Sequence, residues 1–142
     1  MEFVESEQLA QLLDRLYGWS NPLFRRAIRR VMLRRRHAQF YSKTLRRLFA
    51  KHHGVSVGLY SYGVFGHNIP SGTVVGRYTS VAKGLTVING SHPIDWLSTH
   101  PFFFNPDFKY VEELMIKRRD RLIIGHDVYI GQNVTLLPRV EH

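Results

Sequence analysis

The side chains best suited to chemistry lie in residues 87–106, which read VINGSHPIDWLSTHPFFFNP. This stretch contains His92, and an imidazole with an unperturbed pKa of about 6.5 can accept a proton near neutral pH. Asn89 and Asp95 are close enough in sequence to orient that imidazole or to bind hydroxyl groups of a ligand. The alternative for a single histidine is a hydrogen bond within its own loop. We therefore take His92 as the candidate base and keep both interpretations open.

Aromatic side chains follow this histidine closely in the sequence. Trp96 and Phe102 would suit the wall of a ligand pocket, because aromatic faces pack well against sugar rings and apolar molecules. The same residues could instead anchor the loop against a neighbouring subunit, and the two roles are compatible. His100 could also contact a ligand, although packing within the loop is the simpler interpretation.

A metal site is not expected. His92, His100 and His126 share no close ligand spacing, and carboxylates do not cluster with them. The chain has no cysteine, which excludes disulfides and thiolate metal sites.

Aliphatic residues recur every six positions on both sides of this stretch. Of the nine first positions of these hexads, eight are Val, Ile or Leu, and Gly63 is the exception. The position after them is often Gly or Ala, and the fifth is small or β-branched in most hexads. The first positions are Val57, Gly63, Ile69, Val75, Val81, Val87, Ile124, Ile130 and Leu136.

A period of six fits neither an α-helix nor a plain strand, and a short fixed period is typical of a solenoid. We interpret each hexad as one short strand and one corner, with three hexads in each turn. The first position then points inward and stacks on its equivalents, while the small residue after it occupies the corner. Nine hexads make three turns, two before a loop excursion at residues 88–123 and one after it.

The first third of the chain predicts amphipathic helices. Ser6 can cap a helix that ends at Gly18, and Asn21 with Pro22 can begin a second one. A third stretch places Tyr41, Leu45, Leu48 and Phe49 on one face, with the basic residues Lys43, Arg46, Arg47 and Lys51 elsewhere. We expect these helices to cover the open end of the solenoid.

The positive charge is confined to these helices. The net charge is +9, yet residues 25–51 contain eleven Lys or Arg and no acid. A solvated face is the simplest explanation, and attraction to an anionic membrane surface or an acidic glycan through residues 22–52 is the alternative. Nucleic acid is not expected, because the interleaved aromatics and motifs of nucleic-acid binders are lacking.

Two stretches, VGRYTSVAKGLTVINGSHPIDWLSTHPFF and IIGHDVYIGQNVTLLPRV, resemble the hexapeptide-repeat acyltransferases, in particular the xenobiotic and sugar O-acetyltransferases. The resemblance covers about residues 57–140. It implies a mainly β fold, a left-handed parallel β-helix with an extended loop, here preceded by an α-helical N-terminal extension. It also implies a homotrimer and acetyl-CoA as co-substrate.

The same resemblance assigns candidate roles to individual residues. His92, after NGS, matches the general base, and backbone amides near the excursion would stabilise the oxyanion. Gly131 and Gln132 match positions near the pantetheine arm of the coenzyme, although a hexad corner favours glycine in any case. Asn89, Asp95, Trp96, His100 and Phe102 are candidate acceptor-binding residues.

Two segments follow from these patterns, namely a basic helical extension over residues 1–54 and a hexapeptide-repeat domain over residues 55–142. The family pattern continues with further coils beyond LPRV, so we expect the C-terminal coils to be missing from this sequence. The N-terminal MEFVESEQLA lacks the apolar region of a secretory signal, and we expect a cytoplasmic protein, with contact to the inner face of the membrane as an option. The competing function is a non-catalytic trimeric scaffold whose basic helices bind an anionic surface or glycan.

Overall fold

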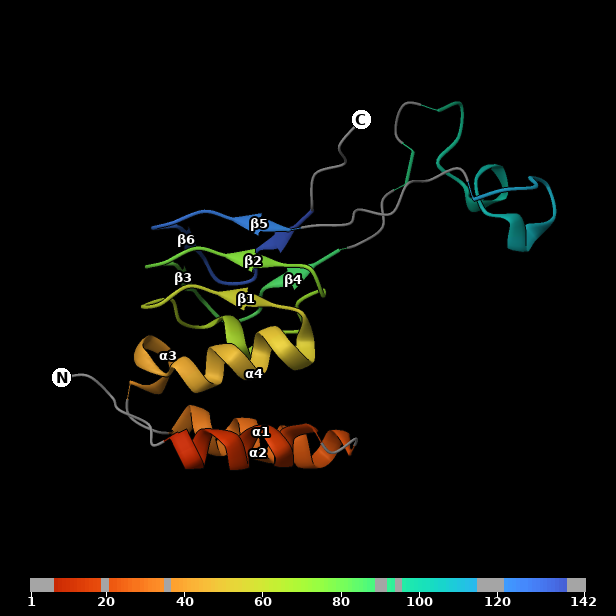
Figure 1. Cartoon of the computed structure of the whole chain (residues 1–142). Helices are drawn as coiled ribbons and strands as arrows, with labels where there is room; N and C mark the ends of the chain where they lie inside the picture. Colours follow the sequence, from red (N-terminus) through yellow and green to blue (C-terminus); the bar gives the residue numbers. More distant parts are fainter. Residues whose placement is uncertain are drawn as a thin grey trace.

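The computed structural model describes residues 7–18, 21–34, 37–88, 92–93, 96–114 and 122–137. Helices come first along the chain and short parallel strands follow (Figure 1). The helices are α1 (Glu7–Gly18), α2 (Pro22–Arg34), α3 (Ala38–Tyr41) and α4 (Lys43–His53), and the short 3-10 helices are η1 (Val64–Gly66), η2 (Pro101–Phe103) and η3 (Pro106–Phe108). The strands are β1 (Ser56–Val57), β2 (Val74–Val75), β3 (Ser80–Val81), β4 (Thr86–Val87), β5 (Ile123–Ile124), β6 (Tyr129–Ile130) and β7 (Thr135–Leu136).

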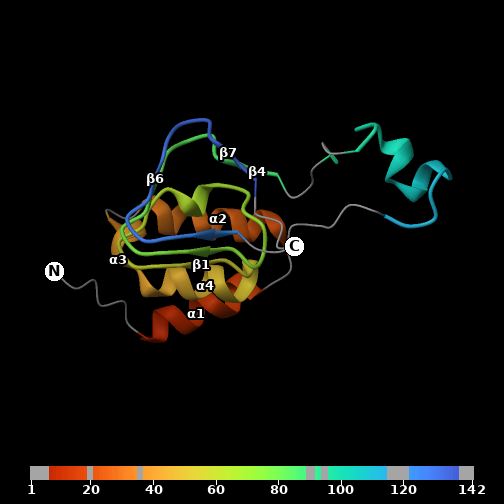
Figure 2. The same ribbon diagram turned by 90° about the horizontal axis from the view of Figure 1, so that it is seen from above.

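The strands stack in three small parallel sheets, ordered β1-β2-β5, β3-β6 and β4-β7. Ser56 pairs with Val74, eighteen residues further along, and Tyr62 bridges to Ser80 at the same offset. Eighteen residues are three hexads, the length that the sequence pattern predicts for one turn. We call residues 55–72, 73–88 and 122–137 the first, second and third coils, and Figure 2 shows them superposed when seen from above.

Apart from Val64 and Phe65 in η1, the buried side chains of the coils are those of the first and fifth hexad positions. Among the first positions, the buried ones are Val57, Val75, Val81, Ile124 and Ile130. The fifth-position residues Ser61 and Thr79 are fully buried, yet their hydroxyls are paired. Ser61 Oγ donates to the carbonyl oxygen of Gly76 at 2.6 Å, and Thr79 Oγ1 donates to that of Gly125 at 3.0 Å. Each hydroxyl therefore ties its coil to the next one.

Glycines at one corner allow neighbouring coils to approach closely. A Cβ atom on Gly58 would collide with the backbone of Gly76, and one on Gly76 would collide with the backbone of Gly125. Gly63, the exception in the hexad pattern, has a φ of 84°, and a Cβ there would collide with the carbonyl oxygen of Val81. The break in the pattern thus marks a position that only glycine can occupy.

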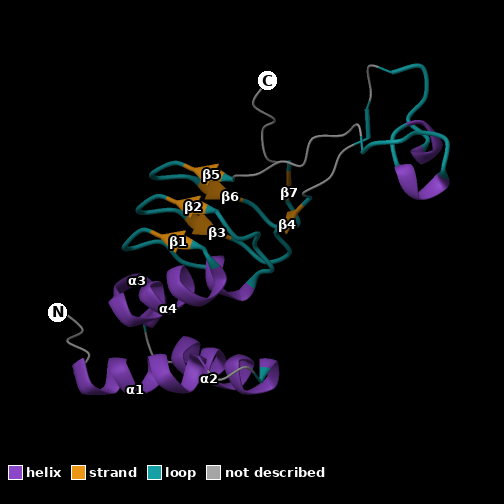
Figure 3. Ribbon diagram, turned by 45° about the vertical axis from the view of Figure 1, so that its right-hand side comes forward, coloured by secondary structure: helices purple, strands orange, loops and turns teal. Residues whose placement is uncertain are grey.

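The helices form two layers below the first coil (Figures 1 and 3). Helix α4 lies directly against the coil and buries Leu45, Leu48 and Phe49. The ring of Phe49 meets that of Phe65 edge-on, with 4.9 Å between centroids. Helices α1 and α2 lie side by side beyond α4 and form the outer layer. None of the described helices combines the length and apolarity needed to cross a bilayer.

The face predicted for the third helical stretch is partly wrong. Tyr41, expected inside, is 42% exposed, and Arg46, expected on the polar side, is buried. The Arg46 guanidinium donates to the backbone carbonyl oxygens of four residues, namely Gln39, Ser42, Gly58 and Ser61. A buried arginine is stable here because carbonyl oxygens surround its donors.

Candidate functional site

His92 belongs to the excursion and not to the edge of a coil. Strand β4 ends at Val87, and the His92 ring contacts Thr99 and Phe104, two residues of the excursion. Its Nδ1 atom lies 2.7 Å from the carbonyl oxygen of Thr99, and its ring meets Phe104 edge-on at a centroid distance of 5.4 Å. Phe104 is buried, so it gives the imidazole a fixed wall, while the His92 side chain itself is exposed.

The contact with Thr99 determines which nitrogen of His92 is basic. A carbonyl oxygen can only accept a hydrogen bond, so Nδ1 must carry a hydrogen. In the neutral ring the lone pair is then on Nε2. The Thr99 contact thus sets the tautomer of the neutral ring, in which Nε2 is the nitrogen able to accept a proton.

His100 has a structural role in the same loop. Its Nδ1 accepts a hydrogen bond from the backbone N–H of Phe102 at 3.4 Å, which caps the start of η2. Its ring also packs edge-on against Phe102, with 4.3 Å between centroids. These contacts agree with the simpler interpretation of His100, packing within the loop.

The aromatic residues of the excursion form a partly exposed cluster. Phe102 lies 5.1 Å from both Phe108 and Tyr110, measured between ring centroids, and all three rings remain exposed. Trp96 is exposed as well. In Figures 1 and 3 the described part of the excursion stands apart from the three coils, so this surface is available to another molecule or subunit.

The remaining candidates lie elsewhere or cannot be placed. Gly131 and Gln132 follow β6 at a corner of the third coil, away from the aromatic cluster. A Cβ atom on Gly131 would meet no described atom closer than a methyl group of Val134 at 3.9 Å, so the described coils do not require glycine there. Asn89 and Asp95 lie outside the described residues.

The described residues contain no group of three or more His, Cys, Asp or Glu side chains placed to hold a metal ion.

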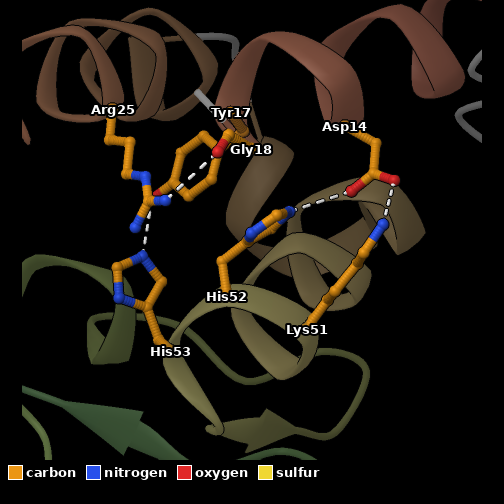
Figure 4. Close-up of polar contacts among 7 residues, drawn as sticks. All are labelled: Asp14, Tyr17, Gly18, Arg25, Lys51, His52 and His53. Carbon is orange, nitrogen blue, oxygen red and sulfur yellow. Dashed lines mark hydrogen bonds and ion pairs between the residues drawn. The ribbon is translucent and has the colours of Figure 1, made fainter. Parts of the chain in front are cut away.

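A second polar cluster, which sequence spacing did not predict, joins α1 to α4 (Figure 4). The carboxylate of Asp14 accepts hydrogen bonds from Lys51 at 2.6 Å and from His52 at 3.0 Å. The Tyr17 hydroxyl lies 2.7 Å from Nε2 of His53. These pairs are separated by more than thirty-five positions along the chain, so no local pattern links them.

The environment of this cluster shifts its pKa values. The hydrogen bonds from Lys51 and then His52 lower the pKa of Asp14. Burial raises the pKa of Tyr17, so its hydroxyl keeps its proton at neutral pH and shares a hydrogen bond with His53. Burial, together with the charges of the neighbouring arginines, lowers the pKa of His53. The cluster thus fixes the outer helix layer to α4 with a neutral imidazole beside cationic groups.

A cavity of about 260 Å³ opens where α2 and α4 meet the first coil. Its polar lining comes from Arg29, His53, His67 and Asn68, and its apolar floor includes Phe49. It lies at the helical end of the molecule, whereas the excursion leaves from the other end (Figure 1). The cavity is therefore separate from the His92 site.

Comparison with known proteins finds similarity to acetyltransferases over about half of the chain. A protein named probable macrolide acetyltransferase from Lysinibacillus sphaericus is 36% identical over 74 residues, which are 47% of this chain and 40% of that protein. A chloramphenicol acetyltransferase from Agrobacterium fabrum is 33% identical over 73 residues, which are 47% of this chain and 34% of that enzyme. One from Escherichia coli is 29% identical over 48% of this chain and 35% of its own length.

The matched regions thus span 40% or less of the length of these relatives. No family model matches the chain, and neither does any solved structure. The similarity supports acetyl transfer as the general class of reaction.

Proposed function

We propose that this chain is part of an acetyl-CoA-dependent O-acetyltransferase of the hexapeptide-repeat family, with His92 as general base. The proposal rests on one geometric observation, the contact of His92 Nδ1 with the Thr99 carbonyl oxygen, which makes Nε2 the basic nitrogen. The similarity to named acetyltransferases supports the reaction class. The parallel pairing at an offset of eighteen residues supports a left-handed parallel β-helix as the fold of the coils.

The proposed reaction is a direct transfer within a ternary complex. As the hydroxyl oxygen of the acceptor attacks the thioester carbonyl carbon, its proton moves to Nε2 of His92. The carbon–sulfur bond then breaks, and the imidazolium returns the proton to the leaving sulfur, which releases free coenzyme A. Backbone amides near the excursion stabilise the oxyanion. No cysteine is needed, and the sequence contains none.

The complete site lies, in this proposal, between subunits of a homotrimer. The excursion stands apart from its own coils and exposes aromatic rings, which supports a position against a neighbouring copy. Gly131 and Gln132 of one copy would then meet coenzyme A near His92 of the next. Trp96, Phe102 and the polar Asn89 and Asp95 would contact the acceptor, which we place among saccharides and antibiotic-like alcohols. The names of the relatives make macrolides and chloramphenicol obvious acceptors to test alongside sugars.

The His92→Ala substitution tests the proposal. With acetyl-CoA and a panel of hydroxylated acceptors, release of free coenzyme A should fall about a hundredfold or more, because a general base typically contributes a factor of this size. His37→Asn is a suitable control, since His37 sits on the helical extension with a φ of 61° that asparagine tolerates. Unchanged turnover in His92→Ala would remove this residue from the mechanism.

Calorimetry with acetyl-CoA separates this proposal from the non-catalytic alternative. Binding of acetyl-CoA supports the enzyme. Absence of both binding and turnover, in a protein shown to be folded, favours a scaffold whose basic helices do the binding.

A further inference from the structure

Helix α2 exposes an apolar stripe on the side that faces away from the rest of the molecule. Met32 is buried, and Ile28 and Arg29 are half-buried on the inner side of this helix. On the opposite side, Leu23, Ala27 and Val31 follow one another at intervals of four residues, which places them in one row. Leu23 is 74% exposed and Val31 is 63% exposed.

A row of arginines runs beside this stripe. Arg26, Arg30 and Arg34 also recur every four residues, and all three are exposed. Helix α2 contains five arginines and no acid, and the acids of the described α-helices, Glu7 and Asp14, are both on α1. We call Leu23, Arg26, Ala27, Arg30, Val31 and Arg34 together the α2 outer face.

Covering the solenoid does not explain the α2 outer face. The residues that contact the first coil are mainly on α4, through Leu48, Phe49 and the Arg46 guanidinium. Helix α2 lies one layer further out, at the end of the molecule opposite the excursion (Figure 1). The fold therefore leaves an apolar row and an arginine row exposed together on its outermost layer.

We propose that the α2 outer face docks on the surface of an anionic lipid bilayer. Lipid phosphates complement the arginines, and the boundary between headgroups and acyl chains accepts the side chains of Leu23 and Val31. A soluble polyanion would match the arginines but would leave the apolar row exposed to water. This proposal does not depend on the proposed acetyl transfer, since none of its residues belongs to the His92 site. It would hold the excursion on the side of the molecule that faces away from the lipid.

Co-sedimentation of the whole chain with vesicles tests this docking. Vesicles of phosphatidylcholine with phosphatidylglycerol should bind the protein at low salt, and added salt should weaken the binding. Changing Arg26, Arg30 and Arg34 together to Gln should lower the partition coefficient about a hundredfold, at roughly fivefold per arginine. The double variant Leu23→Ser with Val31→Ser should lower it about tenfold or more, because two apolar side chains no longer enter the interface.

Matched variants test whether vesicle binding depends on the α2 outer face or on positive charge anywhere on the protein. Arg77, Lys83 and Lys109 are exposed outside the helices, and changing all three to Gln removes the same charge. The Arg77, Lys83 and Lys109 variant should keep most of the vesicle binding. A variant in which Arg26, Arg30 and Arg34 are all changed to Lys should also keep most of it, because attraction to anionic lipid depends on the positive charge more than on the guanidinium geometry. Circular dichroism and thermal unfolding verify that each variant is folded.

Three results would overturn the proposal. One is equal binding to vesicles of pure phosphatidylcholine, and another is an equal loss in the Arg77, Lys83 and Lys109 variant. The third is binding of the chain to heparin or RNA without binding to anionic vesicles, which would assign the arginines to a soluble polyanion. Because the readout is vesicle binding, a failed acetyl-transfer assay would leave this result unaffected.

Discussion

Nε of Arg46 on helix α4 lies 3.0 Å from the carbonyl oxygen of Gly58 on the first coil. The same guanidinium also donates to Ser61 on the coil and to Gln39 and Ser42 before α4. Burial lowers the pKa of Arg46 to about 10, so the group remains charged at neutral pH. Helix α4, and not another coil, lies against this end of the first coil, and the arginine donates to two carbonyl oxygens of that coil, those of Gly58 and Ser61.

Replacing Arg46 with Met should therefore destabilise the protein strongly. The substitution leaves buried carbonyl oxygens without donors, and we expect a loss of about 3 kcal/mol or more in the free energy of unfolding. The free energy of unfolding of Arg46→Lys should lie between those of the wild type and Arg46→Met, because one ammonium group cannot reach the carbonyl oxygens on both sides of α4. Urea unfolding measures the effect, and Arg47→Met, at an exposed position one residue on, is the control. Similar losses for Arg46→Met and Arg47→Met would refute the role assigned to Arg46.

The glycines at the coil corner give a second pair of matched variants. In Gly76→Ala the new Cβ collides with the backbone of Gly125, and we expect destabilisation of about 2 kcal/mol. In Gly125→Ala the Cβ meets no described atom closer than a methyl group of Val128 at 4.0 Å, so the change should be within about 0.5 kcal/mol of neutral. Urea unfolding of both proteins checks the prediction. If Gly76→Ala were as stable as Gly125→Ala, the coils could not approach as closely as described.

His53 makes stability depend on pH below neutrality. Burial and the charges of Arg29 and Arg25 lower its pKa in the folded protein, whereas the unfolded chain has the ordinary value of about 6.5. Below that value the unfolded state binds more protons than the folded state, so stability falls as the pH drops towards the folded pKa. The midpoint of thermal unfolding, measured from pH 7 downwards, should fall in the wild type and fall less in His53→Gln.

Tyr17→Phe is the control for this titration. It removes the hydrogen bond to His53 and should lower stability at pH 7 by about 1 kcal/mol, yet burial and the arginines remain. The fall in the unfolding midpoint below neutrality should therefore persist in Tyr17→Phe. A steep fall that is the same in His53→Gln as in the wild type would assign the titration to another group.

Phe104 should position His92 in the proposed mechanism. Phe104→Leu keeps an apolar side chain but loses the flat edge against the imidazole, so kcat should fall about tenfold while KM for acetyl-CoA stays unchanged. The neighbouring Phe103 is 54% exposed, and Phe103→Leu is the matched control. Steady-state kinetics with a fixed acceptor separates kcat from KM. A rise in KM at constant kcat would show that Phe104 serves binding and not the orientation of His92.

The repeat of six residues could be deduced from the sequence because it is a local and regular signal. Stacked coils place the same position of each hexad in the same environment. The buried side chains of Val57, Val75 and Ile124 accordingly lie in one column. The start of the second helix could be predicted as well. Asn21 was expected to begin it, and its side-chain oxygen accepts a hydrogen bond from the N–H of Leu23 at the start of α2. The interruption of the repeat also predicted that His92 lies in a loop between the coils.

Only the tertiary structure decided which polar groups meet. The partners of Arg46 come from the segments on both sides of α4, and helical periodicity alone assigned its side chain to solvent. The carbonyl oxygen of Thr99 determines the tautomer of His92, and no residue type encodes that contact because every residue has a carbonyl. Packing of α2 against α1 and α3 leaves Leu23 and Val31 exposed, although their apolar character alone would have placed them inside. Repeated apolar spacing predicts a fold because the same position of each repeat is buried in the same way. A hydrogen bond, in contrast, needs two particular atoms that only the folding of the whole chain brings together.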